Sequence, residues 1–343
     1  MSNVAVIGDS RVGACARVLV DYGFNCFSFR CRAGGAEHEL IAAAADFAER
    51  PARPSGNGTP ILFPFPNRIR GGRFEFGSRP FELPRNERGV NAIHGLVYDR
   101  PWRVVRSAPN EVTGRFQLSV DAPDIESLWP ADFQIDVSYS VHGTTPPSPR
   151  GGAGFQPATA TYEPGRLEAY PTLTSRIRVT NPDSRPLPWG FGTHPYFRLP
   201  LAAGGDEARC LVSAPVLSVW ELEELLPTGR LVPVANPAAL RAERPLSDLK
   251  FDTVFTGLTF DSGWCTSRLI DRSAGVEVIF RFDGLFRELV IYTPPSRDSI
   301  CLEPYTCVTD AINLQPRGID AGLRILQPGE SAEGTIVLEA RTI

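Results

Sequence analysis

Two residues of this chain are of types that can exchange protons with a substrate near neutral pH. His194 is one of only four histidines and lies in WGFGTHPYFRLP (189–200), among turn-forming residues and aromatic rings. Glu303 follows the apolar run SICL, so its carboxylate should be partly removed from water. Desolvation raises the pKa of a carboxylate, and a histidine in this setting can titrate near neutrality. A base and an acid of matched strength are what general acid–base catalysis requires.

Other polar residues stand at turns elsewhere in the chain. Asn67 and Arg68 lie in FPFPNRIRGG, His94 lies in NAIHGLVYDRPW, and Asp252 lies in LKFDTVF. Arginine, aspartate and amide side chains hold hydroxyl groups through hydrogen bonds. Aromatic rings can form an apolar platform for a pyranose ring, and the candidates are Trp102, Tyr196, Phe286 and Tyr292. Together with the acid and the base, these residue types predict a sugar site.

Taken one at a time, these residues also have structural interpretations. His194 can fill a gap beside Tyr196 and Phe197, and His94 can cap a turn. Glu303 can be a strand-end carboxylate in an ion pair, and an arginine beside a glycine turn is ordinarily a solvated surface residue. Only the combination of these residues favours catalysis.

The sequence lacks the motifs of several other kinds of active site. The histidines at 38, 94, 142 and 194 show no HxH or HExxH spacing, and the seven cysteines form no CxxC, so no metal cluster is predicted. Lys250 is the only lysine, which disfavours Schiff-base and pyridoxal chemistry. The N-terminal VAVIGDSRVGACARVLVDYG lacks GxGxxG and is better explained as a hairpin than as a dinucleotide site. GxSxG is also absent. The expected cofactor is therefore none.

The composition and charge favour a protein with no nucleic-acid or membrane partner. The chain is 42% hydrophobic and 22% charged, with a formal charge of -4 and scattered arginines. MSNVAVIGDSR is not a signal peptide, and no apolar run reaches the length of a membrane span. An odd number of cysteines fits reduced, mostly buried thiols. We therefore expect a cytoplasmic protein.

Strands should dominate the fold. The chain has 31 glycines and 32 prolines, and turn residues bound short runs rich in Val, Ile, Phe, Tyr and Thr. These runs are RFEFGSRPFEL, FQIDVSYSV, LTSRIRVTN, VEVIFRFDG, ELVIYTPP and GTIVLEA. Only AEHELIAAAADFAER (36–50) and VWELEELL (219–226) look helical. Many strands with few helices predict an all-β fold, a large antiparallel β-sandwich.

We expect one domain over residues 1–343, interrupted by a loop insertion. The segment HGTTPPSPRGGAGFQPATATYEPGR (142–166) is rich in Pro, Gly, Thr and Ala, and it separates two runs that look like neighbouring strands. Because it has little to bury, it is interpreted as a disordered or loosely attached insertion at about 143–166 in a hairpin loop. It should be dispensable for folding.

The order of the motifs resembles that of a known family. NRIRGGRFEF, NAIHG, GTHPYFRLP, FDTVF and CLEPYT occur as they do in aldose 1-epimerases, the galactose mutarotases, and the resemblance runs from about residue 4 to about residue 340 apart from the insertion. It implies the family's galactose mutarotase-like supersandwich. By motif, Glu303 resembles the general base and His194 the general acid. His94, Arg68 and Asp252 resemble residues that hold the ring oxygen and hydroxyls of the sugar.

The resemblance implies an aldose 1-epimerase that interconverts the α and β anomers of a free aldose such as glucose or galactose. Its expected partner is a monosaccharide substrate, and the protein should be a monomer or a homodimer. A hexose-6-phosphate 1-epimerase is the alternative within this fold, although NRI and HPYF favour the free-sugar branch. A non-catalytic carbohydrate-binding β-sandwich is the alternative from another class, and it would need no matched acid and base. A glycoside hydrolase normally needs two carboxylates, and only Glu303 has a fitting position.

Overall fold

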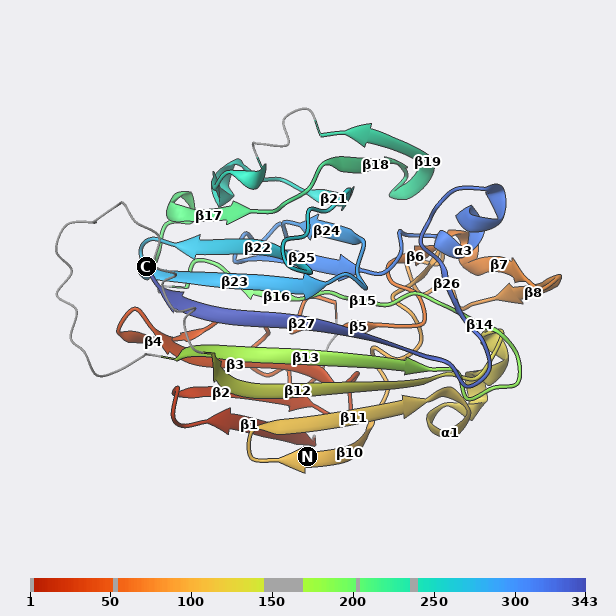
Figure 1. Ribbon diagram of the computed structural model, residues 1–343, viewed down its shortest axis with the longest axis horizontal. Helices are drawn as coiled ribbons and strands as arrows, with labels where there is room; N and C mark the ends of the chain where they lie inside the picture. The colour runs from red at the N-terminus through yellow and green to blue at the C-terminus, as the bar shows by residue number, and fades with distance from the viewer. Residues whose placement is uncertain (1–2, 52–54, 145–168, 202–203, 235–239) are drawn as a thin grey trace.

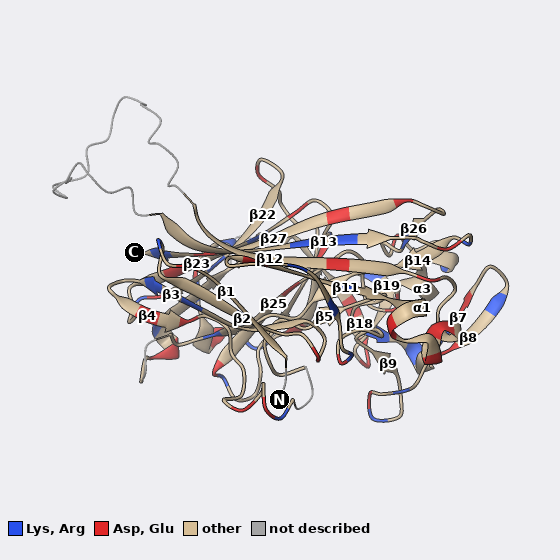
Figure 2. Cartoon of the chain, turned by 90° about the horizontal axis from the view of Figure 1, so that it is seen from below, with Lys and Arg blue, Asp and Glu red and all other residues tan. Residues whose placement is uncertain are grey.

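Two large antiparallel β-sheets pack face to face in the computed structural model, which describes residues 3–51, 55–144, 169–201, 204–234 and 240–343 (Figure 1). Figure 2 shows the layers nearly edge-on, with β12, β13 and β27 in one layer and β5, β18 and β25 in the other. Apolar side chains from both layers form one buried cluster between them. The predicted all-β antiparallel sandwich is confirmed.

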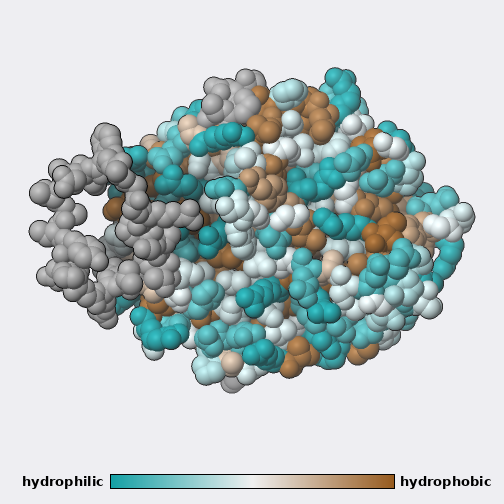
Figure 3. Space-filling model, viewed as in Figure 1, coloured by the Kyte–Doolittle hydropathy of each residue, from teal (hydrophilic) through white to brown (hydrophobic). Residues whose placement is uncertain are grey.

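The first layer is a nine-stranded sheet. Its strands, in spatial order, are β10 (Arg103–Ala108), β11 (Glu111–Gln117), β12 (Gln134–Thr144), β13 (Tyr170–Thr180), β27 (Ser331–Thr342), β23 (Val276–Asp283), β22 (Trp264–Asp271), β17 (Cys210–Ser213) and β20 (Arg244–Pro245). β12 illustrates how these strands face the core: its buried residues alternate with half-buried ones, which is the pattern of a strand with one face on the core. The molecular face seen in Figure 3 accordingly mixes hydrophilic and hydrophobic residues.

The second layer is an eight-stranded sheet. Its strands, in spatial order, are β19 (Leu226–Pro233), β18 (Ser218–Glu223), β21 (Asp252–Thr256), β24 (Glu288–Tyr292), β25 (Ser299–Tyr305), β15 (Gly192–Thr193) and β5 (Ile61–Leu62), and β16 (Tyr196–Arg198) also pairs with β25. β25 is buried along its whole length. A strand buried on both faces must have a second layer of residues over its outer face, and that face carries the site described below.

Smaller elements surround the two sheets. A four-stranded sheet holds β1 (Val4–Asp9), β2 (Ala14–Leu19), β3 (Asn25–Ala33) and β4 (Ala36–Glu39). Three pairs are β6 (Arg68–Ile69) with β9 (Ala92–Ile93), β7 (Arg73–Phe76) with β8 (Arg79–Glu82), and β14 (Leu187–Trp189) with β26 (Arg324–Leu326). The helices are α1 (Leu118–Asp121), α3 (Ala311–Leu314) and the 3-10 turns η1 (Arg70–Gly72), η2 (Pro123–Leu128), η3 (Glu207–Arg209), η4 (Leu246–Asp248) and η5 (Gln315–Arg317). Within the described ranges no helix is both long and apolar enough to cross a membrane.

Several predicted hairpins are present. The N-terminal stretch forms β1 and β2 as an antiparallel pair, and RFEFGSRPFEL forms β7 and β8. β12 and β13 are neighbours as predicted, and their pairing extends to Thr144 opposite Tyr170. The predicted insertion at about 143–166 lies outside the described residues from position 145 onward.

The helix predicted over residues 36–50 is wrong. Its first part is β4, and Ile41 forms an isolated bridge with Phe197. The Glu39 carboxylate accepts a hydrogen bond from the backbone N–H of Phe29 at 2.7 Å. β4 pairs with β3, and beyond it the backbone N–H groups of Ala42 and Ala44 donate to Tyr196 O and Asn57 Oδ1. These contacts with distant segments override the local helix propensity.

The helix predicted over residues 219–226 is also wrong. The segment forms β18, a two-residue turn and the start of β19. Glu224 and Leu225 at the turn have φ angles of 50° and 65°, the left-handed pair that a tight hairpin requires. The Trp220 ring is buried and its Nε1 donates to Glu288 at 3.0 Å. A buried partner on β24 thus decides the conformation of this segment.

Gly95 joins two segments that carry site residues. Its φ is 78°, it forms a parallel bridge with Phe63, and a Cβ built on it would stand 2.1 Å from the Phe63 carbonyl oxygen. The next residue, Leu96, donates its N–H to that same oxygen at 2.7 Å. Only glycine allows the two backbones to come this close.

We therefore predict that Gly95→Ala destabilises the fold by about 3 kcal/mol or more, because backbone strain and an immovable backbone contact add together. Gly77→Ala is the matched control: Gly77 has a φ of 57° with nothing within 4 Å of the built Cβ, so only the left-handed strain of about 1–2 kcal/mol applies. Urea unfolding of both variants measures the difference. Equal losses would contradict the close approach of Gly95 to Phe63.

Candidate active site

Strand β25 separates two environments. Ile300 and Leu302 belong to the apolar cluster between the two sheets. Cys301, Glu303 and Tyr305 alternate with them and therefore project from the opposite face of the strand. Glu303 is only 2% exposed, although it is a carboxylate. Because side chains alternate along β25, the Glu303 carboxylate points away from the core and toward the opposite face of the sheet.

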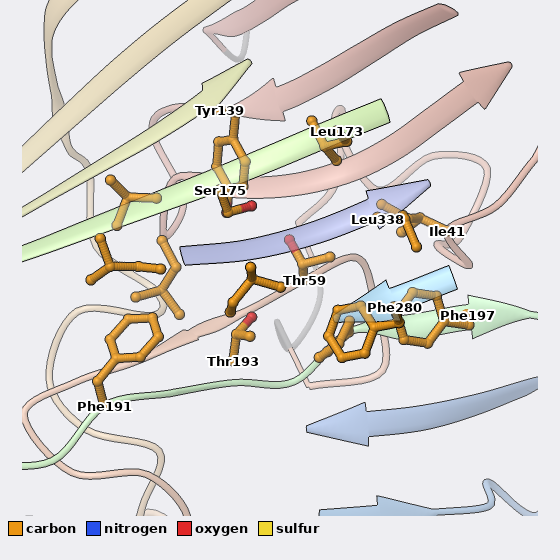
Figure 4. A pocket seen from close by; sticks show the side chains of 15 residues that line it. Ile41, Thr59, Tyr139, Leu173, Ser175, Phe191, Thr193, Phe197, Phe280 and Leu338 are labelled. Carbon is orange, nitrogen blue, oxygen red and sulfur yellow. The ribbon is translucent and has the colours of Figure 1, made fainter. Parts of the chain in front are cut away.

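The stretch around His194 alternates in the same way. Phe191, Thr193 and Phe197 line an apolar cavity between the two sheets (Figure 4). Tyr196 is opposite Cys301 in the β16–β25 register and so shares the outer face with it. The cavity of about 40 Å³ has room for little more than a water molecule. A sugar does not fit there, and the chemistry must lie on the other side of the strand, with His194.

The predicted base and acid are in direct contact. His194 Nε2 lies 3.3 Å from Glu303 Oε1. The Tyr305 hydroxyl donates a hydrogen bond to Glu303 Oε2. The Tyr196 ring stacks on the imidazole with centroids 4.6 Å apart, and its hydroxyl lies 3.4 Å from Nε2. The two segments that the sequence nominated separately therefore form one constellation.

Burial moves the pKa values of the pair in opposite directions. It raises the pKa of Glu303 well above its usual range, against the hydrogen bond from Tyr305, and the negative charge of Asp252 adds to the increase. Burial lowers the pKa of His194 well below its usual range, and the neighbouring His94 lowers it further. The sequence predicted the direction for Glu303, but its expectation that His194 titrates near neutrality is wrong. Both shifts favour an uncharged pair.

His94 and Asn67 flank the pair at the ends of two further strands, β9 and β6. The His94 ring lies 5.7 Å from the His194 ring, and its backbone N–H donates to the Asn67 carbonyl at 2.8 Å. Both residues have a left-handed backbone, with φ angles of 69° and 55°. Burial lowers the pKa of His94 to about 3, so this ring is neutral at pH 7. The β6–β9 pairing brings these two predicted residues together.

Arg68 is held by a carboxylate that the sequence did not reveal. Its Nε donates to Glu87 Oε1 at 2.8 Å, and its Nη1 donates to Asn67 Oδ1 at 2.9 Å. Glu87 also accepts a hydrogen bond from Asn91 Nδ2 at 3.0 Å. The PRNERG loop that carries Glu87 has no distinguishing motif. Only the folding of this loop against β6 makes Glu87 part of the site.

The strand register places Asp252 on the same face of the sheet as Glu303 and Cys301. Asp252 is opposite Tyr292, and Tyr292 is opposite Cys301. Directly opposed residues of an antiparallel sheet share a face. The Tyr292 ring lies 6.2 Å from the His194 ring. Asp252 is exposed at the end of this row, which suits a residue that meets a hydroxyl-bearing ligand.

Two of the four predicted platform residues do not reach the site. Trp102 is buried and stacks on Phe24 with centroids 5.5 Å apart. Phe286 is buried against Phe191 at 6.0 Å. Both belong to the cluster between the sheets. Composition alone could not separate these core rings from Tyr196 and Tyr292, because tertiary packing decides which rings enter the core.

The structure also groups three potential metal ligands that their spacing in the sequence hides. The ligand atoms of His194, Cys301 and Glu303 all lie within 4.8 Å of one another. The sequence predicted no metal cluster, since its histidines and cysteines lack the usual spacings. Strand pairing, not sequence proximity, creates this group.

Comparison with known proteins decides the family. The model of the aldose 1-epimerase family matches residues 30–146 and 165–339. The chain belongs to this family. A relative described as an uncharacterised protein, YihR of Escherichia coli (strain K12), is 24% identical to this aldose 1-epimerase family member over 281 residues, which cover 79% of this chain and 75% of YihR.

Solved structures agree with the fold. A galactose mutarotase-like protein from Clostridium acetobutylicum superposes with a TM-score of 0.78 at 22% identity, over 96% of this chain and 93% of its own. A GalM/aldose epimerase homologue from C. elegans superposes with a TM-score of 0.76 at 18% identity, over 100% of both chains. At these identities the likeness establishes the supersandwich fold of this family member and no more.

The hydrogen bond from Tyr305 makes a prediction about the titration of Glu303. Because the bond favours the carboxylate form, Tyr305→Phe should raise the pKa of Glu303 further and move its titration to higher pH. Infrared difference spectra of the carboxyl band against pH measure the midpoint. Tyr22→Phe, a half-buried tyrosine packed on Phe47, is the control and should leave the midpoint in place. A midpoint that Tyr305→Phe does not raise would refute the stabilising role of this hydroxyl.

Proposed function

We propose that the protein is an aldose 1-epimerase that interconverts the α and β anomers of a free aldose such as glucose or galactose. Family membership implies an isomerase. The observation that carries the proposal is the contact of 3.3 Å between His194 Nε2 and Glu303 Oε1, inside a buried site. One group that accepts a proton and one that delivers it stand where a single sugar ring can meet both.

The chemistry needs one proton removed and one proton added. Glu303 takes the proton from the C1 hydroxyl while His194 gives a proton to the ring oxygen, so the C1–O bond to the ring oxygen breaks. The open-chain aldehyde rotates about C1–C2. The hydroxyl that was the ring oxygen then attacks the other face of the aldehyde and closes the ring, with the two proton transfers reversed. General acid–base catalysis of this kind contributes about 10²–10⁴-fold for each group.

The opposed pKa shifts suit this exchange. The pair needs one proton in total: it starts as carboxylate and imidazolium and ends ring opening as carboxylic acid and neutral imidazole. Burial favours the uncharged arrangement, which is the state reached after the ring has opened. The ring oxygen therefore receives its proton from an imidazolium that its surroundings disfavour, so that proton is readily given up.

The neighbouring polar residues bind the substrate in this proposal. Arg68, His94 and Asp252 hold the sugar's ring oxygen and hydroxyls, and Asn67 supports Arg68 through its amide oxygen. The neutral His94 ring can donate or accept, which suits a hydroxyl partner. Tyr292 offers an aromatic surface beside His194. These roles follow from the contacts above and from the family's motifs.

The pairing of two arginines, Arg68 and Arg70, with carboxylates favours a free sugar over a sugar phosphate. Arg68 is paired with Glu87, and Arg70 lies 3.8 Å from Asp310. A phosphate site needs arginines that are available for charge-assisted hydrogen bonds, and these two already have carboxylate partners. A non-catalytic sugar-binding module would have no use for a buried acid and base in contact.

Two substitutions should separate binding from chemistry. Arg68→Ala should mainly raise KM, because its contacts exist in ground and transition states alike. Glu303→Gln should mainly lower kcat, by about 10²–10⁴-fold. Polarimetry on freshly dissolved α-glucose and α-galactose measures both. Arg103→Ala on β10, which breaks an ion pair with Asp121 of α1, is the control. If no aldose mutarotates faster with the wild-type protein, the proposed function is wrong, and a fall in kcat alone for Arg68→Ala would reassign that residue.

Activity should follow a bell-shaped dependence on pH. At low pH both groups hold a proton and no base remains; at high pH neither does and no acid remains. In His194→Asn the residual activity should rise with pH through the raised pKa of Glu303 and then stay level. In Glu303→Gln it should fall as pH rises through the lowered pKa of His194. The measurement is kcat/KM against pH. Near-normal rates and an unchanged profile in His194→Asn would make His194 structural and His94 the candidate acid.

A further inference from the structure

Cys301 occupies the centre of the site but has no part in the proposed reaction. It lies two residues before Glu303 on β25, so both side chains project from the same face. In the strand register it stands between Tyr196 on one side and Tyr292 on the other. The side chain is fully buried, and among the described residues no hydrogen bond to its thiol is found. An unpartnered thiol therefore faces the acid and the base.

One of the three donor pairs already has the spacing of two zinc ligands. Bonds of about 2.0–2.3 Å in a tetrahedron place nitrogen, oxygen and sulfur donors about 3.3–3.7 Å apart. His194 Nε2 and Glu303 Oε1 already stand at 3.3 Å, and all three donor atoms lie within 4.8 Å. Three protein ligands leave the fourth position to water or to a sugar hydroxyl.

The donor set and its charge determine the class of ion. A thiolate is a soft ligand that selects Zn²⁺ or Cd²⁺ over Mg²⁺ and Ca²⁺. Cys301 and Glu303 would bring two negative charges, with Asp252 beyond Tyr292 in the same row. Arg68 opposes them, but its charge is balanced by Glu87.

We propose that His194, Cys301 and Glu303 bind one soft divalent cation, Zn²⁺ or Cd²⁺, and that this ion inhibits the enzyme. The ion takes the lone pairs of His194 Nε2 and the Glu303 carboxylate, which are the atoms that exchange protons with the sugar. The Cys301 thiol and the protonated Glu303 carboxyl each give their proton to solvent when they bind the ion, and the neutral His194 binds through Nε2 without losing a proton. The inhibitory effect rests on the proposed function, whereas the cation site itself does not.

Binding can be tested without any sugar. Cd²⁺ is added to the full chain, and the ultraviolet thiolate-to-cadmium absorption is followed. One equivalent of cadmium should produce the band in the wild type. Cys301→Ser should abolish it, and Cys265→Ser, at an equally buried thiol on β22, should keep it. No band, or a band that survives Cys301→Ser, overturns the site whether or not the protein is an epimerase.

Inhibition is tested by polarimetry, with each variant compared with its own rate in EDTA. Zn²⁺ should lower the wild-type rate, EDTA should restore it, and Mg²⁺ should have no effect. Cys301→Ser should raise the Zn²⁺ concentration for half-inhibition at least about tenfold, because loss of even an outer-shell partner of a metal ligand costs about 10–100-fold in metal affinity, while Cys265→Ser should not. Equal inhibition of wild type and Cys301→Ser overturns the inhibitory role, and loss of activity in EDTA would instead make the ion a requirement.

Discussion

A buried carboxylate at the middle of the eight-stranded sheet is the constraint on which the site depends. An ionised carboxylate removed from water is costly unless hydrogen bonds or a partner charge compensate for it. Glu303 has both of its oxygens engaged, one by the Tyr305 hydroxyl and one by His194. Because the imidazole is equally buried, neither partner gains by becoming charged alone. The pair therefore acts as a unit that holds one proton, and reversible ring opening in the proposed function needs such a unit.

The loops around this pair are held by contacts that are local in space and distant in sequence. Asn67 and His94 both adopt left-handed backbones, which cost about 1–3 kcal/mol each for residues other than glycine. The hydrogen bond between them and the close approach of Gly95 to Phe63 keep them in place. The strain thus occurs at His94, which the proposed function assigns to the substrate, and at Asn67, which it assigns to the support of Arg68.

The alternation of side chains along a strand sends one set of residues to the core face of the sheet and the other set to the site face. Alternate residues of β25 and of residues 191–197 go to the core or to the site, and a register shift of one residue would exchange the two sets. The same alternation places the Cys301 thiol beside Glu303. The acid and the base on this face, His194 and Glu303, are also potential metal ligands. One site can therefore support both the proposed reaction and the proposed cation.

The sequence by itself determined the fold class and several strands, because alternation, β-branched residues and turn-formers act locally. It also nominated His194 and Glu303 as an acid–base pair, and the fold brings these two residues into contact. It misassigned residues 36–50 and 219–226, where pairing with β3 and the burial of Trp220 override local propensity. Tertiary structure alone decided that Glu87 holds Arg68, that Trp102 and Phe286 belong to the core, and that His194 is too buried to titrate near neutrality. The physical reason is common to all of these: burial and register depend on segments far apart in the chain, and no local pattern encodes them.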